Sequence, residues 1–351
     1  MPVSRVLSRR DGETVIAYAG RRLGWAIVLL LCVTVFTFVL LHMIPGNPAL
    51  ILAGMGAKKS QIHALYVQLG LNRPLPVQYI KYVEGLVHLN LGRSAVTGDA
   101  VTTDLAHFLP ATIELVVISF TIYVLLAIPL GAWSARRQGR VAEAFVRITA
   151  IVGSGMPVFW LGALFQGLFF AKLHWLPDGG ELAITASAPP DRTGIFLIDS
   201  PLAGQWGTFW QTILHLILPV ATIVIAMLAV GLRSTRASVL QELRRPYVRT
   251  AESKGVAGVR LMAVHVMKNA LNPVVSLLGL QFGFLLGWIC LVETVFSWPG
   301  IGLYLYNSIQ SFDYAPIMAI TLLISATFIV VNLLTDLIYP VLDPRLRDRQ
   351  E

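Results

Sequence analysis

The stretch WAIVLLLCVTVFTFVLL at residues 25–41 decides the fold class of this 351-residue chain. It contains no charged side chain, and a helix needs about 20 mostly apolar residues to cross a bilayer. With its flanks, the stretch predicts a membrane-spanning helix at 23–44. Its apolar core is too long for a cleaved signal peptide and no small-x-small cleavage pattern follows, so we expect a retained span.

The composition of the whole chain supports a membrane protein. Apolar residues make up 56% of the chain and charged residues 13%, whereas soluble domains carry about a quarter charged residues. We therefore expect an all-α protein with six spans. The third span contains Gly153, Gly155 and Pro157 and is expected to be kinked or tilted. The predicted spans are 23–44, 111–135, 146–172, 213–232, 272–292 and 315–338.

Basic residues are distributed unevenly between the connections. With a cytoplasmic N-terminus, twenty of the 27 Lys and Arg residues fall in the cytoplasmic segments. The positive-inside rule therefore predicts that both termini are cytoplasmic. The formal net charge of +8 then reflects orientation in the membrane and attraction to anionic lipid, and nucleic acid is not expected as a partner.

The predicted spans divide the chain into four parts. Two outer segments, 45–110 and 173–212, are too long to be plain turns, and the amphipathic run at 76–89 predicts an interfacial helix. The four parts are a cytoplasmic N-terminal segment at 1–22, the first span with a long outer segment at 23–110, a five-span core at 111–338 with a cytoplasmic loop at 233–271, and a cytoplasmic tail at 339–351.

The loop at 233–271 differs from the other connections. Pro246 marks a break, and the basic sequence YVRTAESKG follows at 247–255. Gly255 is expected to allow a turn or a close backbone approach. Apolar residues then recur at helical spacing and predict an amphipathic helix that leads into the fifth span. These apolar residues are Val256, Val259, Met262, Ala263, Val266, Met267 and Ala270.

The sequence lacks the motifs of an ATP-binding protein, a metalloprotein or a serine hydrolase. The string nearest to a P-loop, GAKKS at 56–60, has no first glycine. No two of the seven histidines have the spacing of a helical zinc site. Ser154 between two glycines does not match a nucleophile elbow and favours close helix packing. We therefore expect no enzyme activity, and no cofactor or metal on this chain.

Three acidic residues lie near the ends of predicted spans. They are expected to anchor the helices at the interface or to accept buried hydrogen bonds. The sequence shows no acidic relay in the middle of a span, which weakens the interpretation as a proton-coupled carrier. A secondary carrier or channel that works without an ATPase remains the alternative. The three residues are Glu114, Glu293 and Asp336.

The segment 247–255 resembles the cytoplasmic EAA loop of bacterial ABC-importer permeases. Of the general pattern E-A-A-x-x-x-G, only Ala251 and Gly255 keep the letters, but the dipeptide/oligopeptide branch pattern R-T-A-x-A-K-G is matched except at Ser253. Asn47 stands where this branch usually has Asp. Seven further strings resemble the branch, namely IPGNPA at 44–49, LGLNRPLPVQY at 69–79, NLGRS at 90–94, LPATIEL at 109–115, HLILP at 215–219, ETVFSWPGIG at 293–302 and LDPR at 342–345.

This resemblance implies a fold, a function and a set of partners. The fold would be that of a type I ABC-importer permease, which moves di- or oligopeptides or similar small solutes across the bacterial inner membrane by alternating access. The implied partners are a second homologous permease subunit, two ATP-binding subunits that carry ATP and Mg, and a periplasmic or lipoprotein solute-binding protein. The solute and the path-lining residues stay open. The residues implied to contact the ATP-binding subunit are Arg249, Thr250, Ala251, Glu252, Ser253, Lys254 and Gly255.

Overall fold

The computed structural model describes residues 15–43, 48–54, 56–68, 70–137, 139, 141–256 and 258–342. These residues form helices joined by turns and loops, with no β-strand among them. The predicted all-α class is therefore confirmed. Most of the predicted N-terminal segment and tail, and parts of the strings at 44–49, 69–79 and 342–345, lie outside the described residues.

Five helices of the described chain are long and apolar enough to cross a membrane. Each of them matches one of the predicted spans, and all five extend beyond it at one end or both, two of them by ten residues or more. One begins at Val101, ten residues before the predicted span, and another continues to Leu243, eleven residues beyond it. The five helices are α1 (Val15–Met43), α5 (Val101–Arg136), α9 (Trp206–Leu243), α12 (Met267–Val295) and α14 (Tyr314–Leu342).

The predicted span at 146–172 is divided into three helical pieces. The break lies at Pro157, which has no backbone N–H to continue the helical hydrogen bonds. Gly153 packs directly on α9, because a Cβ atom at this position would lie 2.7 Å from the carbonyl oxygen of Ile225. Glycine here permits close helix packing, as the sequence predicts. The pieces are α6 (Val141–Gly155), α7 (Val158–Phe165) and the π-helical turn η1 (Gln166–Lys172).

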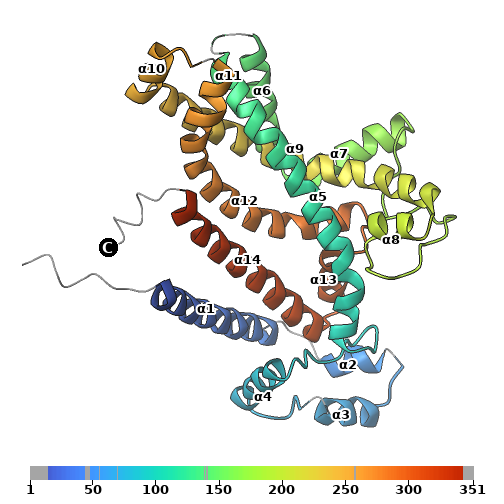
Figure 1. Ribbon diagram of the computed structural model, residues 1–351. Helices are drawn as coiled ribbons and strands as arrows, with labels where there is room; N and C mark the ends of the chain where they lie inside the picture. The colour runs from blue at the N-terminus through green and yellow to red at the C-terminus, as the bar shows by residue number, and fades with distance from the viewer. Residues whose placement is uncertain are drawn as a thin grey trace, which may run out of the picture.

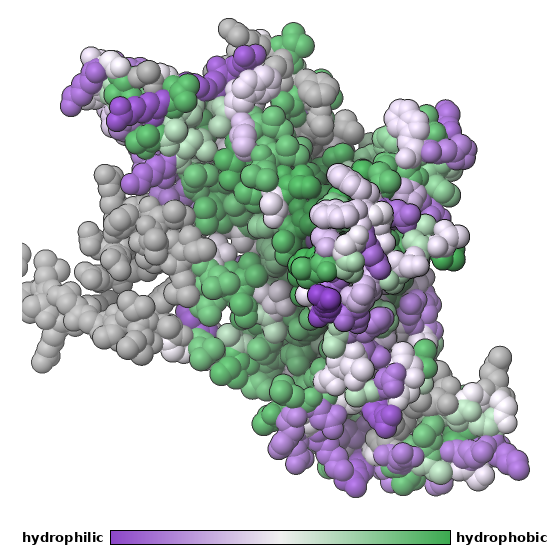
Figure 2. Space-filling view, turned by 45° about the vertical axis from the view of Figure 1, so that its right-hand side comes forward, coloured by the Kyte–Doolittle hydropathy of each residue, from purple (hydrophilic) through white to green (hydrophobic). Residues whose placement is uncertain are grey.

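The short helices gather at opposite ends of the molecule. Figure 1 shows α10 and α11 beside α6 at one end, and α2, α3 and α4 at the other. In Figure 2, apolar residues form a broad area across the visible face, and hydrophilic residues gather at the upper left, along the bottom and on the right-hand side. The run predicted as a helix at 76–89 forms α4, and its place at a membrane interface stays a prediction. The short elements are α2 (Pro48–Ala53), α3 (Lys59–Gln68), α4 (Leu75–Val87), α8 (Phe196–Leu202), α10 (Pro246–Ser253), α11 (Gly258–Arg260), the π-helical turn η2 (Leu261–Val266) and α13 (Ile301–Gln310).

The largest apolar core lies where α5, α9 and α12 pack together. Leu115 and Tyr123 of α5, Ile223 and Met227 of α9, and Leu285 of α12 are all fully buried there. Each such side chain contributes roughly 1.5–3 kcal/mol when it leaves water, although the gain relative to lipid is smaller because lipid tails are equally apolar. The core holds α9 against the other spans, and α9 leads directly into α10.

Candidate coupling site

Helix α10 begins where the chain turns sharply after α9. Arg245 has an extended backbone (φ −72°, ψ 145°), and Pro246 occupies the first helical position. Proline suits this position because its φ is already helical and the N–H that it lacks would have no partner within the helix. The break predicted at Pro246 is confirmed, and it lets α10 leave the direction of α9.

Helix α10 ends in a Schellman motif centred on Gly255. The N–H of Val256 donates to the carbonyl oxygen of Ala251 at 3.2 Å, and the N–H of Gly255 donates to that of Glu252 at 2.9 Å. Gly255 has φ +78°, a left-handed conformation that favours glycine. A Cβ atom here would meet no other atom within 4 Å. The predicted turn is therefore confirmed, and within this chain Gly255 serves the turn rather than a close contact.

One face of α10 is anchored in an apolar cluster, called here the α10 cluster. Helix α10 contributes Val248 to this cluster, and the Val248 side chain is only 1% exposed. Ala251 and Val256 are half-buried against the same cluster, which supplies the apolar contact typical of a Schellman motif. The buried members, drawn from α5, α9, α10, η2 and α12, are Ala135, Val239, Val248, Leu261, Met262, Val266 and Ala270.

The opposite face of α10 is exposed. The hydroxyl groups of Thr250 and Ser253 donate to carbonyl oxygens of their own helix, at 3.2 Å and 2.9 Å. Among the described residues, no oppositely charged group lies within ion-pair distance of Arg249, Glu252 or Lys254. The structure thus brings the seven implied residues together on one short helix and its cap, and leaves their charged groups available.

Tyr247 connects α10 to both neighbouring spans, a role that the sequence did not suggest. Its hydroxyl donates to a carboxylate oxygen of Glu242 in α9 at 2.7 Å and accepts from the Asn269 amide of α12 at 3.1 Å. Burial and the hydrogen bond to Glu242 raise the pKa of Tyr247. Because its two partners lie on different helices, Tyr247 can transmit a displacement of α10 to α9 and α12 together.

The amphipathic helix predicted after Gly255 is correct only in part. Met262 and Val266 are buried as expected, but Val259 is 78% exposed and Ala263 is exposed as well. The reason is the π-helical turn η2, in which hydrogen bonds span five residues and shift the buried face from the usual 3.6-residue spacing. Leu261, which lies outside the predicted stripe, is buried instead.

Two of the sequence strings meet at the end opposite to α10. Glu293 of ETVFSWPGIG is fully buried and accepts a 2.7 Å hydrogen bond from the Thr112 hydroxyl of LPATIEL. It also accepts from the N–H groups of Gly302 and Leu303 at the start of α13. A carboxylate in this place satisfies N–H groups that have no partner within the helix. The prediction of a buried hydrogen bond for Glu293 is confirmed.

The segment at 173–205 is organised around buried carboxyl groups. Glu114 of α5 accepts a hydrogen bond from the Leu197 N–H at 3.0 Å, and Glu181 lies beside it. Burial, together with the neighbouring Glu114, raises the pKa of Glu181 to about 9. Burial also raises the pKa of Asp199, but hydrogen bonds from Thr193 and its neighbours lower it overall. The structure does not describe the side chain of Asp336, the third acidic residue considered in the sequence.

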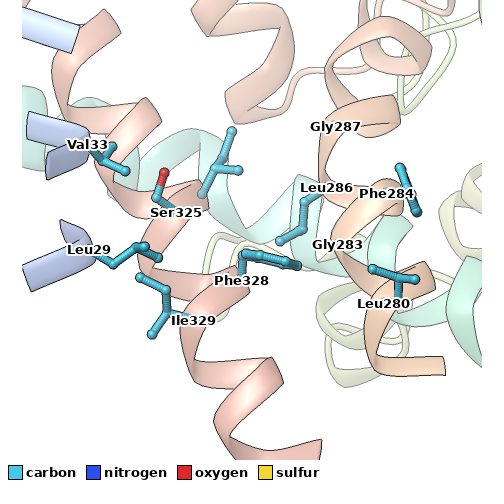
Figure 3. A pocket seen from close by; sticks show the side chains of 11 residues that line it. Leu29, Val33, Leu280, Gly283, Phe284, Leu286, Gly287, Ser325, Phe328 and Ile329 are labelled. Atoms are coloured by element: carbon cyan, nitrogen blue, oxygen red, sulfur yellow. The ribbon is translucent and has the colours of Figure 1, made fainter. Parts of the chain in front are cut away.

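An apolar cavity of about 380 Å³ lies among α1, α12 and α14 (Figure 3). Val33 of α1, Phe284 of α12 and Phe328 of α14 are among its lining residues, and Ser325 provides its only polar side chain. Such a lining offers almost no hydrogen-bonding groups to a polar solute. The cavity therefore does not identify residues of a solute path.

Two family models match most of the chain. Residues 127–348 match the family described as "Binding-protein-dependent transport system inner membrane component". Residues 15–116 match the one described as "Binding-prot-dependent transport system membrane comp, N-term". The larger match includes α10 and Gly255.

Curated proteins of similar sequence span nearly the full chain. The probable D,D-dipeptide transport system permease protein DdpB of Escherichia coli (strain K12) is 39% identical, over 93% of this chain and 96% of its own. The dipeptide transport system permease protein DppB of Alkalihalophilus pseudofirmus is 38% identical, over 95% and 99%. The di/tripeptide transport system permease protein DppB of Pseudomonas aeruginosa is 37% identical, over 95% and 100%.

These matches confirm the resemblance seen in the sequence and favour it over a carrier or channel without an ATPase. The match to the larger family alone covers more than half of the chain. Together with the five apolar helices, it places the protein in the bacterial inner membrane as a multi-pass permease rather than an enzyme. The chain belongs to the family of inner-membrane components of binding-protein-dependent transport systems.

Proposed function

We propose that this chain forms part of the translocation path of an ATP-driven importer for di- and oligopeptides or similar small solutes. The relatives named above are described as permeases for D,D-dipeptides, dipeptides and di/tripeptides, which supports a peptide substrate. The single observation that carries the mechanism is α10, a short helix with one anchored face and one exposed face. We assign the contact with the ATP-binding subunit to Arg249–Gly255.

The proposed topology has six spans with both termini cytoplasmic. In this topology α6, α7 and η1 form the third span, and the break at Pro157 lies within it. The three pieces cover residues 141–172, which is long enough to cross the hydrocarbon core at about 1.5 Å per helical residue, even with a kink. The end with α10 then faces the cytoplasm, and α2, α3, α4 and the outer segment at 173–205 face the periplasm.

The proposed assembly contains a second homologous permease subunit and two ATP-binding subunits that carry ATP and Mg. No cofactor is assigned to this chain. A periplasmic or lipoprotein solute-binding protein would dock on the outer segments at 45–110 and 173–212. The four-part division of the chain at 1–22, 23–110, 111–338 and 339–351 is retained as part of this proposal.

Coupling follows from the two attachments of α10. Val248 fixes the helix to the α10 cluster, and Tyr247 joins it to α9 and α12. When ATP-binding subunits close, a displacement of α10 would be carried into these two spans. The spans would then reorient around a central path and open it alternately to either side of the membrane.

The test uses two glycines in matching Schellman motifs at opposite ends of the molecule. Gly204 ends α8 with φ +71° and, like Gly255, has no atom within 4 Å of an added Cβ. Valine at either position is strained by about 1 kcal/mol or more, because a β-branched residue disfavours positive φ. Gly255→Val is expected to reduce solute-stimulated ATP hydrolysis of the co-expressed complex at least tenfold, with the chain still inserted.

Gly204→Val is the matched control for association with the ATP-binding subunit, because it adds the same backbone strain far from α10, in the segment proposed to dock the solute-binding protein. It is expected to keep the ATP-binding subunit bound during purification, whereas Gly255→Val weakens this association. If both variants keep wild-type association and ATP hydrolysis, the assignment of Arg249–Gly255 to the motor contact is wrong. Uptake of a labelled dipeptide by proteoliposomes then tests the substrate class separately.

A further inference from the structure

A second charged site lies between α6 and α9, close to the end that carries α10. It is a cavity of about 270 Å³, and its charged lining residues are Arg147, Arg233, Arg236 and Glu143. Three cations against one carboxylate leave the lining with a local charge of +2. A concave site with such an excess attracts anions.

The arginines of this cavity are only partly neutralised by the described residues. Arg236 pairs with Glu143 through one terminal nitrogen, but its Nε is buried and has no hydrogen-bond acceptor. Arg233 uses its Nε to donate to the Ala229 carbonyl oxygen at 3.2 Å, and its terminal nitrogens remain available. Burying a charged donor without an acceptor is costly. An anionic oxygen in the cavity would remove this cost.

The remaining lining indicates an amphiphilic ligand rather than a free ion. Leu232 is 3% exposed and Val146 is half-buried, and both pack with Ala229 and Leu130 in the membrane-spanning parts of α9 and α5. Ile148, on the next part of α6, is 59% exposed and apolar. The arginines therefore border a surface suited to lipid tails. The cavity is also smaller than the roughly 300–1,000 Å³ of pockets for drug-sized ligands, which argues against a transported peptide.

We propose that this cavity binds the headgroup of an anionic phospholipid from the leaflet on the α10 side. Arg147, Arg233 and the buried Nε of Arg236 would donate to the phosphate oxygens, for which the guanidinium fork is well suited. Basic pockets between spans on the cytoplasmic side bind anionic headgroups in this way. An adjoining groove contains Arg244 and Arg245, so the lipid would lie beside the segment that leads into α10.

This inference rests on the proposed function in one respect only. The proposed function places α10 on the cytoplasmic side, and this placement identifies the leaflet that supplies the lipid. Lipid binding is measured on the purified full-length chain without transport or ATP, so its failure and the failure of the coupling mechanism are distinguishable. The variant Arg147→Ala/Arg233→Ala removes two cations but keeps the pair between Arg236 and Glu143. Arg260→Ala is the matched control, since Arg260 is an exposed arginine at the same end and outside the cavity.

Native mass spectrometry with phosphatidylglycerol and phosphatidylcholine gives the readout. The wild-type chain is expected to retain phosphatidylglycerol preferentially, and the double variant to lose about twenty-fivefold in affinity, since each basic residue near an anionic lipid contributes about fivefold. Arg260→Ala is expected to bind as the wild type does. Glu143→Gln raises the local charge to +3 and is expected to bind more tightly.

Three results would overturn the proposal. One is equal retention of the two lipids by the wild type, and another is an unchanged preference in the double variant. The third is complete displacement of phosphatidylglycerol by millimolar inorganic phosphate, which would make the ligand a free anion. Partial displacement only, with the lipid preference retained, supports the lipid as the source.

Discussion

At the scale of single residues, Val248 and Gly255 determine how α10 is presented. Val248 is buried among residues of α5, α9, η2 and α12, while the neighbouring Arg249 and Thr250 are exposed. Gly255 ends the helix with a positive φ and returns the chain to the α10 cluster at Val256. Apolar anchoring on one side therefore leaves the polar side chains on the other side for a partner.

Val248→Ala is expected to loosen α10 without exposing the rest of the core. The change removes two buried methyl groups and leaves a small cavity, with a cost of about 1–3 kcal/mol. Hydrogen exchange of the amides at 247–255 should therefore become faster. Thr250→Ala is the control, because its exposed hydroxyl bonds only to its own helix. Equal exchange in the two variants would show that the cluster does not hold α10.

At the scale of elements, the stability of the segment at 173–205 is expected to depend on the protonation of Glu181. Its pKa is raised from 4.5 to about 9, so the folded segment binds this proton more tightly than the unfolded chain does. The resulting stabilisation is fully present below about pH 4.5 and is lost as the pH rises toward 9. Glu114 faces Glu181, and Asp199 acts electrostatically on Glu114. The His215 Nδ1 contacts the carbonyl oxygens of Gly179 and Gly180 nearby.

Hydrogen exchange of residues 173–205 is expected to be slower at pH 6 than at pH 8.5, after correction for the intrinsic exchange rate. Glu181→Gln keeps a neutral side chain of the same size and should remove most of this difference. Asp199 has a lowered pKa and stays charged across this range. If the variant keeps the wild-type pH dependence, the effect belongs to another group, and the role assigned to Glu181 is wrong.

The elements also show how far the sequence alone can lead. The apolar runs predict six spans because lipid requires long apolar segments, and five of them appear as long apolar helices of the described chain. Pro246 and Gly255 predict the limits of α10. The π-helical turn η2 was missed, since it leaves no signal in the residue spacing. Contacts distant in sequence were missed as well. Glu114 and Glu181 are 67 positions apart, and neither residue reveals that the other lies beside it.

At the scale of the whole molecule, the polar ends have different roles in the proposed importer. The end with α10 carries the motor contact, and the end with α2, α3 and α4 faces the solute-binding protein (Figure 1). The packed spans α5, α9 and α12 connect the two ends. The matched families fix the class of protein, whereas the direction of the chain in the membrane is part of the proposal.

Site-specific photo-crosslinking in cells that express the whole importer tests this arrangement most directly. A photoreactive residue at the exposed Glu252 of α10 is compared with one at the exposed Gln61 of α3. The proposed arrangement predicts that the ATP-binding subunit is captured from position 252 and not from position 61. Capture of the ATP-binding subunit from position 61, or its absence at position 252 in an active importer, would contradict the assignment of α10 as the coupling helix.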